Sequence, residues 1–96
     1  MTAIEVTCSP HPGGDGWACV VVVTDATGSG RHIVRVRPAD LRRYAPGATE
    51  PADLARRSFE FLLEREPRSS ILSAFDLPVI ERYFPEYAST IGRRPV

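Results

Sequence analysis

The sequence contains no lysine, asparagine or glutamine, and all twelve of its basic residues are arginine. A GC-rich coding sequence accounts for this bias better than selection for an activity. Without lysine the chain has neither the phosphate-binding lysine of a P-loop nor a lysine that forms a Schiff base. Without asparagine it has no N-glycosylation site. These absences exclude several classes of enzyme and one common modification.

Long apolar runs and cysteine clusters are also absent. The longest apolar stretch, residues 17–23, is too short to cross a bilayer, and residue 1 is not followed by the charged start and apolar run of a secretion signal. The only cysteines are Cys8 and Cys19, too few for a disulfide scaffold. We therefore predict a cytoplasmic protein with no membrane partner, in which both cysteines are reduced thiols.

The composition is that of an ordinary globular domain. Of the 96 residues, 43% are hydrophobic and 25% are charged, and twelve acids balance the twelve arginines. A chain of this length folds around one core. We predict a single domain over residues 1–96, with a β-meander at 1–37, a helical half at 38–92 and a frayed tail at 93–96.

Three stretches have the patterns of β-strands. Residues 2–8 and 31–37 alternate between two kinds of side chain, which is typical of a half-buried strand. Residues 17–24 are rich in valine on both faces, which indicates a central strand. The segments between them, 9–16 and 25–30, are rich in glycine and other turn formers. The sequence predicts a three-stranded antiparallel meander.

Symmetric turns would fix the rows of this sheet. The core face would then carry the rows Ile4–Val21–Val34 and Val6–Cys19–Val36, and the opposite face Ala3–Val22–Ile33 and Glu5–Val20–Arg35. A register shift of two residues preserves both faces, whereas a shift of one mixes valines with arginines. The faces therefore follow from the alternation, and only the rows depend on the turns.

The second half of the chain is predicted to be helical. Apolar residues at helical spacing indicate a main helix at about 50–66, and shorter helices are expected at 38–44, 70–75 and 78–91. Pro85 should break or kink the last of them. The fold class is therefore α+β, with the helices packed on one face of the meander and Val21 and Phe59 buried between them.

Part of the helical half resembles a known group of proteins. The segments SFEFLLEREP at 58–67, SIL at 70–72, FDL at 75–77 and YFPEY at 83–87 are similar to the C-terminal half of a group of small uncharacterised bacterial proteins. The resemblance implies a strand-rich first half. It implies no activity.

One set of residues has the types that bind zinc: Cys8, His11, Cys19 and His32. In the predicted rows Cys19 and His32 lie two same-face rows apart, which separates their Cα atoms by about 14 Å and excludes a shared ion. Cys8, His11 and Cys19 remain an alternative metal set. The sequence favours two buried thiols and a loop histidine, so we predict no metal and no cofactor.

No catalytic motif is found. The glycine-rich loop at 13–16 lies between strands and has neither the helix nor the lysine of a phosphate loop. Ser58 and Ser69 are not in a G-x-S-x-G turn. Asp15 and His11 share a loop and have acid–base chemistry, but a solvated loop pair is the commoner arrangement. We therefore predict a non-enzymatic protein with no catalytic residues.

Two surfaces are candidates for a partner. The sheet face opposite the helices has an apolar centre with a charged rim, a pattern typical of protein–protein contacts; its residues are Ala3, Glu5, Val20, Val22, Ile33, Arg35 and Arg37. Residues 31–49 carry five arginines and one acid, a local charge of +4, which suggests nucleic-acid binding as the alternative. No exposed aromatic is interleaved with these arginines. The leading prediction is a protein-interaction module that self-associates as a homodimer.

Overall fold

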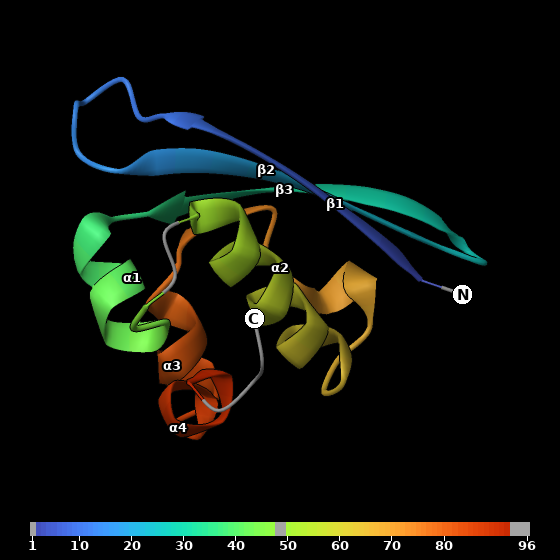
Figure 1. The fold of residues 1–96 in the computed structure, drawn as a ribbon. Helices are drawn as coiled ribbons and strands as arrows, with labels where there is room; N and C mark the ends of the chain where they lie inside the picture. Colours follow the sequence, from blue (N-terminus) through green and yellow to red (C-terminus); the bar gives the residue numbers. More distant parts are fainter. Residues whose placement is uncertain (1, 48–49, 93–96) are drawn as a thin grey trace.

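A computed structural model describes residues 2–47 and 50–92 of the chain. Its elements in chain order are β1 (Ala3–Pro10), β2 (Trp17–Asp25), β3 (Gly28–Val36), α1 (Pro38–Tyr44), α2 (Pro51–Leu63), the 3-10 helix η1 (Arg68–Ser70), β4 (Ala74–Asp76), α3 (Val79–Tyr83) and α4 (Tyr87–Ile91). The helices lie on one side of the sheet, and no described element covers its other side (Figure 1). The α+β class is confirmed. The predicted frayed tail, residues 93–96, lies outside the described residues.

The sheet has four strands in the order β1-β2-β3-β4. The antiparallel meander of the first three is confirmed, but β4 was not predicted and runs parallel to β3. The helix predicted at 70–75 is therefore wrong. Flanking β4, the Ile33 N–H donates to the Ser73 carbonyl and the Leu77 N–H to the Arg35 carbonyl, at 2.8 and 3.0 Å. These bonds satisfy backbone groups of β3 that would otherwise lack protein partners.

The two faces of the sheet are as predicted, but the rows are not. Val21 pairs with Val6 on one side and His32 on the other, so each hairpin is shifted by two residues from the symmetric arrangement. A shift of two keeps every side chain on its face. The core face therefore keeps its valines, while each side chain has different cross-strand neighbours.

The first shift arises because β1 continues through Pro10. The Ile4 carbonyl accepts a hydrogen bond from Arg56 Nη1 at 2.6 Å, so it points away from β2 toward the free edge. Backbone direction alternates along a strand, which turns the nitrogen of Pro10 to the same edge. The missing N–H of Pro10 thus removes no bond of the ladder.

The second shift arises because the β2–β3 loop contains only two residues, Ala26 and Thr27. Asp25 Oδ1 accepts hydrogen bonds from the Thr27 N–H at 2.8 Å and from the Thr27 hydroxyl at 2.6 Å. Gly28 follows with φ of +136°, which favours glycine. This side-chain closure lets both strands extend to the loop.

α1 has the predicted bounds, 38–44, whereas α2 ends three residues earlier than predicted. Pro38 and Pro51 occupy the first turns of α1 and α2, where a missing N–H has no intrahelical partner to lose. α2 ends at Leu63, because the N–H groups of Arg65 and Glu66 both bond the Leu62 carbonyl and close the last turn. The segment predicted as one helix at 78–91 is two helices, α3 and α4. The predicted break at Pro85 is confirmed.

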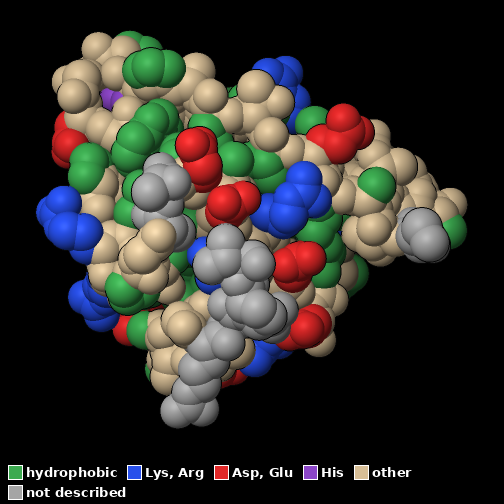
Figure 2. Space-filling view, in the orientation of Figure 1, with side chains coloured by type: hydrophobic (Ala, Val, Ile, Leu, Met, Phe, Trp, Pro, Cys, Tyr) green, Lys and Arg blue, Asp and Glu red, His purple; other side chains and the backbone are tan. Residues whose placement is uncertain are grey.

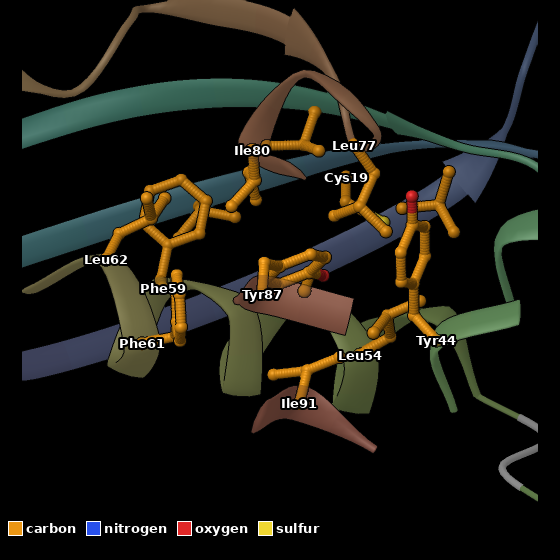
Figure 3. Close-up of a cluster of buried hydrophobic side chains, with 14 of the residues drawn as sticks. Cys19, Tyr44, Leu54, Phe59, Phe61, Leu62, Leu77, Ile80, Tyr87 and Ile91 are labelled. Atoms are coloured by element: carbon orange, nitrogen blue, oxygen red, sulfur yellow. The ribbon is translucent and has the colours of Figure 1, made fainter. Parts of the chain in front are cut away.

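The core lies between the sheet and the helices (Figure 3). Val21 and Phe59 are fully buried, as predicted. Phe61 meets Tyr87 edge to face with ring centroids 5.2 Å apart, and Tyr44 packs on the other side of Tyr87 at 5.0 Å. These rings join α1, α2 and α4 into one layer beneath the sheet.

Cys8 and Cys19 are disulfide-bonded, so the prediction of two thiols is wrong. The two residues are directly opposite each other on β1 and β2, with Cα atoms 4.0 Å apart. The symmetric register had placed Cys19 opposite Val6, which concealed the pair. Because both sulfur atoms are in the bridge, neither is a thiolate ligand for a metal in this state.

Candidate functional site

The uncovered side of the sheet, which we call the outer face, is formed by alternate residues of β1, β2 and β3. Its rows are Ala3–Thr24–Ser29, Glu5–Val22–Arg31, Thr7–Val20–Ile33 and Ser9–Ala18–Arg35. Ala74 and Asp76 of β4 extend the last two rows, beside Ile33 and Arg35. The face is thus a shallow surface four strands wide at one end.

Six of the seven predicted partner-binding residues lie on this face, namely Ala3, Glu5, Val20, Val22, Ile33 and Arg35. The structure brings Val20 beside Ile33 and Glu5 beside Val22, whereas Ala3 pairs with Thr24. Arg37 follows the end of β3, and its guanidinium pairs with Asp76 at 3.1 Å. The backbone N–H of Arg37 donates to Asp40 Oδ2 at 2.9 Å. Arg37 is therefore engaged in fixing the β3–α1 junction.

Sequence reasoning missed the place of Arg31 in these rows. Arg31 lies in one row with Val22 and Glu5, so this row carries an acid, an apolar centre and a base in that order. The sequence does place Arg31 on this face, because it is two residues from Ile33 in the same strand. The shift of the β2–β3 hairpin puts Arg31 opposite Val22, and the shift of the β1–β2 hairpin brings Glu5 into the same row.

The centre of the outer face is apolar and open. Ile33 is 44% exposed, which is unusual for an isoleucine in an inner strand, while Val20 and Val22 are half-buried by their neighbours. A hollow of about 440 Å³ opens beside Ile33; it is lined by His11, Pro12, Ala18, Ile33, Arg35, Ala74, Phe75 and Asp76. An exposed apolar centre with an adjoining hollow is suited to contact with another protein surface.

The arginines of this face differ in their engagement. Arg35 Nη2 donates to the Asp15 carbonyl at 3.3 Å, which ties β3 to the β1–β2 loop. Arg31 is exposed, and no hydrogen bond or ion pair engages its side chain among the described residues. In the row Glu5–Val22–Arg31, the guanidinium of Arg31 is therefore available to a partner.

The edges of the sheet are poorly suited to pairing with another strand. At the β1 edge, Arg56 occupies the carbonyl of Ile4, and Pro10 offers no donor. β4, at the opposite edge, has only three residues. Short or blocked edges of this kind discourage strand addition. The outer face, and not an edge, is therefore the part of the sheet that is open to contact.

The helical side of the molecule presents acidic and basic side chains among hydrophobic ones (Figure 2). Across the described residues 2–47 and 50–92, no group of three or more metal-ligating side chains comes together. In the same part of the chain, no helix has the length and apolar character needed to span a membrane.

Comparisons with protein-family models, with curated proteins and with solved structures found no match for this chain. The resemblance of residues 58–87 to a group of small bacterial proteins stays a prediction.

Proposed function

We propose that this chain is a non-enzymatic interaction module that forms a homodimer through the outer face. The observation that carries the proposal is the row Glu5–Val22–Arg31, which places opposite charges on either side of an apolar central strand. A surface with this arrangement is complementary to a second copy of itself. Such self-complementarity is what a two-fold interface requires.

The charges select one geometry. If a two-fold axis runs along β2 between two stacked sheets, Val20 and Val22 of one protomer meet the same valines of its partner. The axis exchanges the two sides of β2, so Glu5 of each protomer lies over Arg31 of the other. Sheets packed face to face in the aligned manner sit about 10 Å apart, a spacing that side chains fill.

A two-fold axis across the strands is disfavoured. It would place β3 of one protomer over β3 of the other and bring Arg31 toward Arg35. Like charges brought together in an interface oppose association. The axis along β2 is therefore the one that we propose.

The area of the outer face sets the expected affinity of the dimer. Nine-residue strands about 30 Å long, in a sheet about 14 Å wide, offer an area on the order of 400 Å² per protomer. A standard stable interface buries about 800 Å² per partner. We therefore expect a reversible dimer, with a dissociation constant in the micromolar range or weaker.

Val22→Glu tests the proposal, because it places a charge on the two-fold axis while the buried side of β2 stays unchanged. Analytical ultracentrifugation over a wide range of concentration should show a dimer for the wild type and a folded monomer for this variant. Ser89→Glu, on the exposed surface of α4, is the matched control and should still dimerise. A wild-type protein that is monomeric at millimolar concentration would refute the proposal.

The alternative is nucleic-acid binding through the arginines of β3. It is weakened because Arg35 and Arg37 are engaged with Asp15 and Asp76. Under this alternative Arg31→Glu and Arg35→Glu would abolish a salt-dependent affinity for RNA or DNA, and the slope of log affinity against log salt would become shallower. Salt-sensitive binding by a monomeric wild type would establish it.

A cytoplasmic location remains part of the proposal, and the disulfide makes it testable. In a reducing compartment Cys8 and Cys19 are thiols, whereas in an oxidising one they form the bridge. Alkylation of free thiols in intact cells, before lysis, distinguishes the two states. Unmodified, bridged cysteines in freshly lysed cells would contradict a cytoplasmic location.

A further inference from the structure

On the helical side, a second hollow of about 310 Å³ opens between the end of α2, β4 and α3. Its lining is mostly apolar: Leu62, Glu66, Ser70, Ile71, Leu72, Phe75, Val79, Ile80, Tyr83 and Phe84. None of these residues lies on the outer face of β1, β2 or β3, and of the ten only Phe75 also lines the hollow beside Ile33. Its volume is at the lower end of the range for small-molecule sites.

Three aromatic rings and one carboxylate are the distinguishing groups of this hollow. Phe75, Tyr83 and Phe84 line it together with Glu66. Tyr83 is 68% exposed, a large value for a tyrosine that borders a cavity. Aromatic faces carry a negative quadrupole, and rings arranged around a cavity attract an alkylated ammonium group.

Glu66 is the only ionic side chain in the lining, and no hydrogen bond or ion pair engages its carboxylate among the described residues. The nearby bases are committed elsewhere. Arg65 stacks on Phe61 and pairs with Glu86 at 3.1 Å, and Arg68 pairs with Asp25 at 3.2 Å. The charge of Glu66 is thus available to a ligand.

The helix α3 keeps its own charges away from the hollow. Val79, Ile80 and Tyr83 lie on one side of a turn at about 100° per residue, which points Arg82 away from them. On the same helix, Glu81 accepts hydrogen bonds from Arg43 and Tyr44. The lining of the hollow therefore has a net negative charge and no competing cation.

We propose that this hollow binds a free small molecule with a quaternary or other alkylated ammonium group. The rings of Phe75, Tyr83 and Phe84 contact the methyl groups of the cation, and Glu66 balances its charge at the rim. Water hydrates a cation of this type only weakly, so an aromatic hollow with one carboxylate suits it.

The test compares choline with its uncharged carbon isostere, 3,3-dimethylbutan-1-ol, by NMR titration of the labelled protein. The two have the same shape, so apolar contact alone gives no preference for choline. We expect choline to bind roughly five-fold more tightly than the isostere. The shifted amide signals should be those of residues that line the hollow. Equal or tighter binding of the isostere, or no binding of choline at tens of millimolar, would overturn the proposal.

Two variants assign the preference to its residues. Glu66→Gln should abolish most of the preference for choline. Tyr83→Leu should weaken the binding of choline more than the binding of the isostere. Tyr83 is exposed, so the fold does not depend on it. Glu60→Gln, an exposed acid of α2 outside the hollow, is the matched control and should leave the preference unchanged. Equal effects of Glu60→Gln and Glu66→Gln would refute a local site.

A final arm tests the source of the cation. A short peptide that carries trimethyllysine has the same headgroup as choline. Tighter binding of this peptide than of choline would overturn the assignment to a free small molecule.

Discussion

Arg68 joins the start of η1 to the tip of the β2–β3 hairpin, 43 residues away in the sequence: its Nε donates to Asp25 Oδ2 at 3.2 Å. Its Nη2 also donates to the Thr27 hydroxyl at 3.2 Å. The hairpin tip extends beyond the helices (Figure 1). These bonds are therefore a tether between the tip and the second half of the chain.

This tether predicts an acid-sensitive contribution to stability. The hydroxyl and N–H of Thr27, with smaller contributions from Arg68, lower the pKa of Asp25 from 3.8 to about 2. The contribution of the Asp25 carboxylate to folding stability is therefore complete above about pH 4 and is lost as the pH falls through 2. In a carbon-13 NMR titration of the carboxyl group, Thr27→Ala should raise the pKa of Asp25 more than Arg68→Leu does. The reverse order would contradict this assignment of causes.

A second prediction concerns the fully buried pair Ser58 and Tyr87. The Ser58 hydroxyl donates to the Leu54 carbonyl at 2.7 Å, so the Tyr87 hydroxyl, 2.6 Å from Ser58 Oγ, must be the donor in their contact. Ser58→Ala leaves the Tyr87 hydroxyl unpaired and should lower the free energy of unfolding by roughly 1–3 kcal/mol. Tyr87→Phe removes that donor and should lower it by only about 1 kcal/mol.

Urea denaturation measures both variants, and Ser89→Ala on the exposed surface of α4 is the control. A larger loss for Tyr87→Phe than for Ser58→Ala would show that the direction of the hydrogen bond is wrong.

Alkaline pH tests the contact between α1 and α3. Burial, and then the hydrogen bond that its hydroxyl donates to Glu81 at 2.7 Å, raises the pKa of Tyr44 from 10.0 to about 12. The folded state favours the neutral form of Tyr44. The contribution of this form to folding stability is complete below pH 10 and is lost as the pH rises through 12. NMR titration of labelled tyrosine should show Tyr44 still protonated at pH 11. Ionisation of Tyr44 near pH 10 would contradict the contact.

The disulfide gives a fourth prediction. Cys8 and Cys19 are 11 residues apart in sequence, and closing a loop of this length stabilises a fold by about 3 kcal/mol in the chain-entropy account. Addition of a reductant should therefore lower the thermal midpoint of the wild type. The double variant Cys8→Ala with Cys19→Ala should not respond to the reductant. An unchanged wild-type midpoint would mean that the bridge does not form in solution.

The alternation of side chains predicts the faces of the sheet but not its register. Which face of the sheet is buried follows from β3, where valines alternate with arginines, because a shift of one residue would bury the arginines. The rows depend on Pro10, which the sheet accommodates only because its nitrogen faces an edge, and on the bonds between Asp25 and Thr27. Neither Pro10 nor the bonds between Asp25 and Thr27 affect the periodicity of the sequence. The register could therefore not be predicted, and the disulfide and the row of Arg31 depend on the register.

β4 was missed for a different reason. Three residues, Ala74–Asp76, are too few to show alternation, and they become a strand only because β3 offers unpaired backbone groups beside them. The residues of the second hollow, such as Glu66 and Tyr83, come together through this same packing. Local sequence carries no signal for contacts of that kind.

The proposed dimer is tested most directly by exchanging charges across it. In the two-fold arrangement along β2, Glu5 of one protomer lies over Arg31 of its partner, so Glu5→Arg or Arg31→Glu alone brings like charges together. Each single variant should weaken the dimer in analytical ultracentrifugation, and the double variant Glu5→Arg with Arg31→Glu should restore it. Glu5→Arg combined with Arg35→Glu, whose row is two removed, should not. Failure of the matched double variant to recover, or the same association state for every variant, would contradict a homodimer built on the outer face.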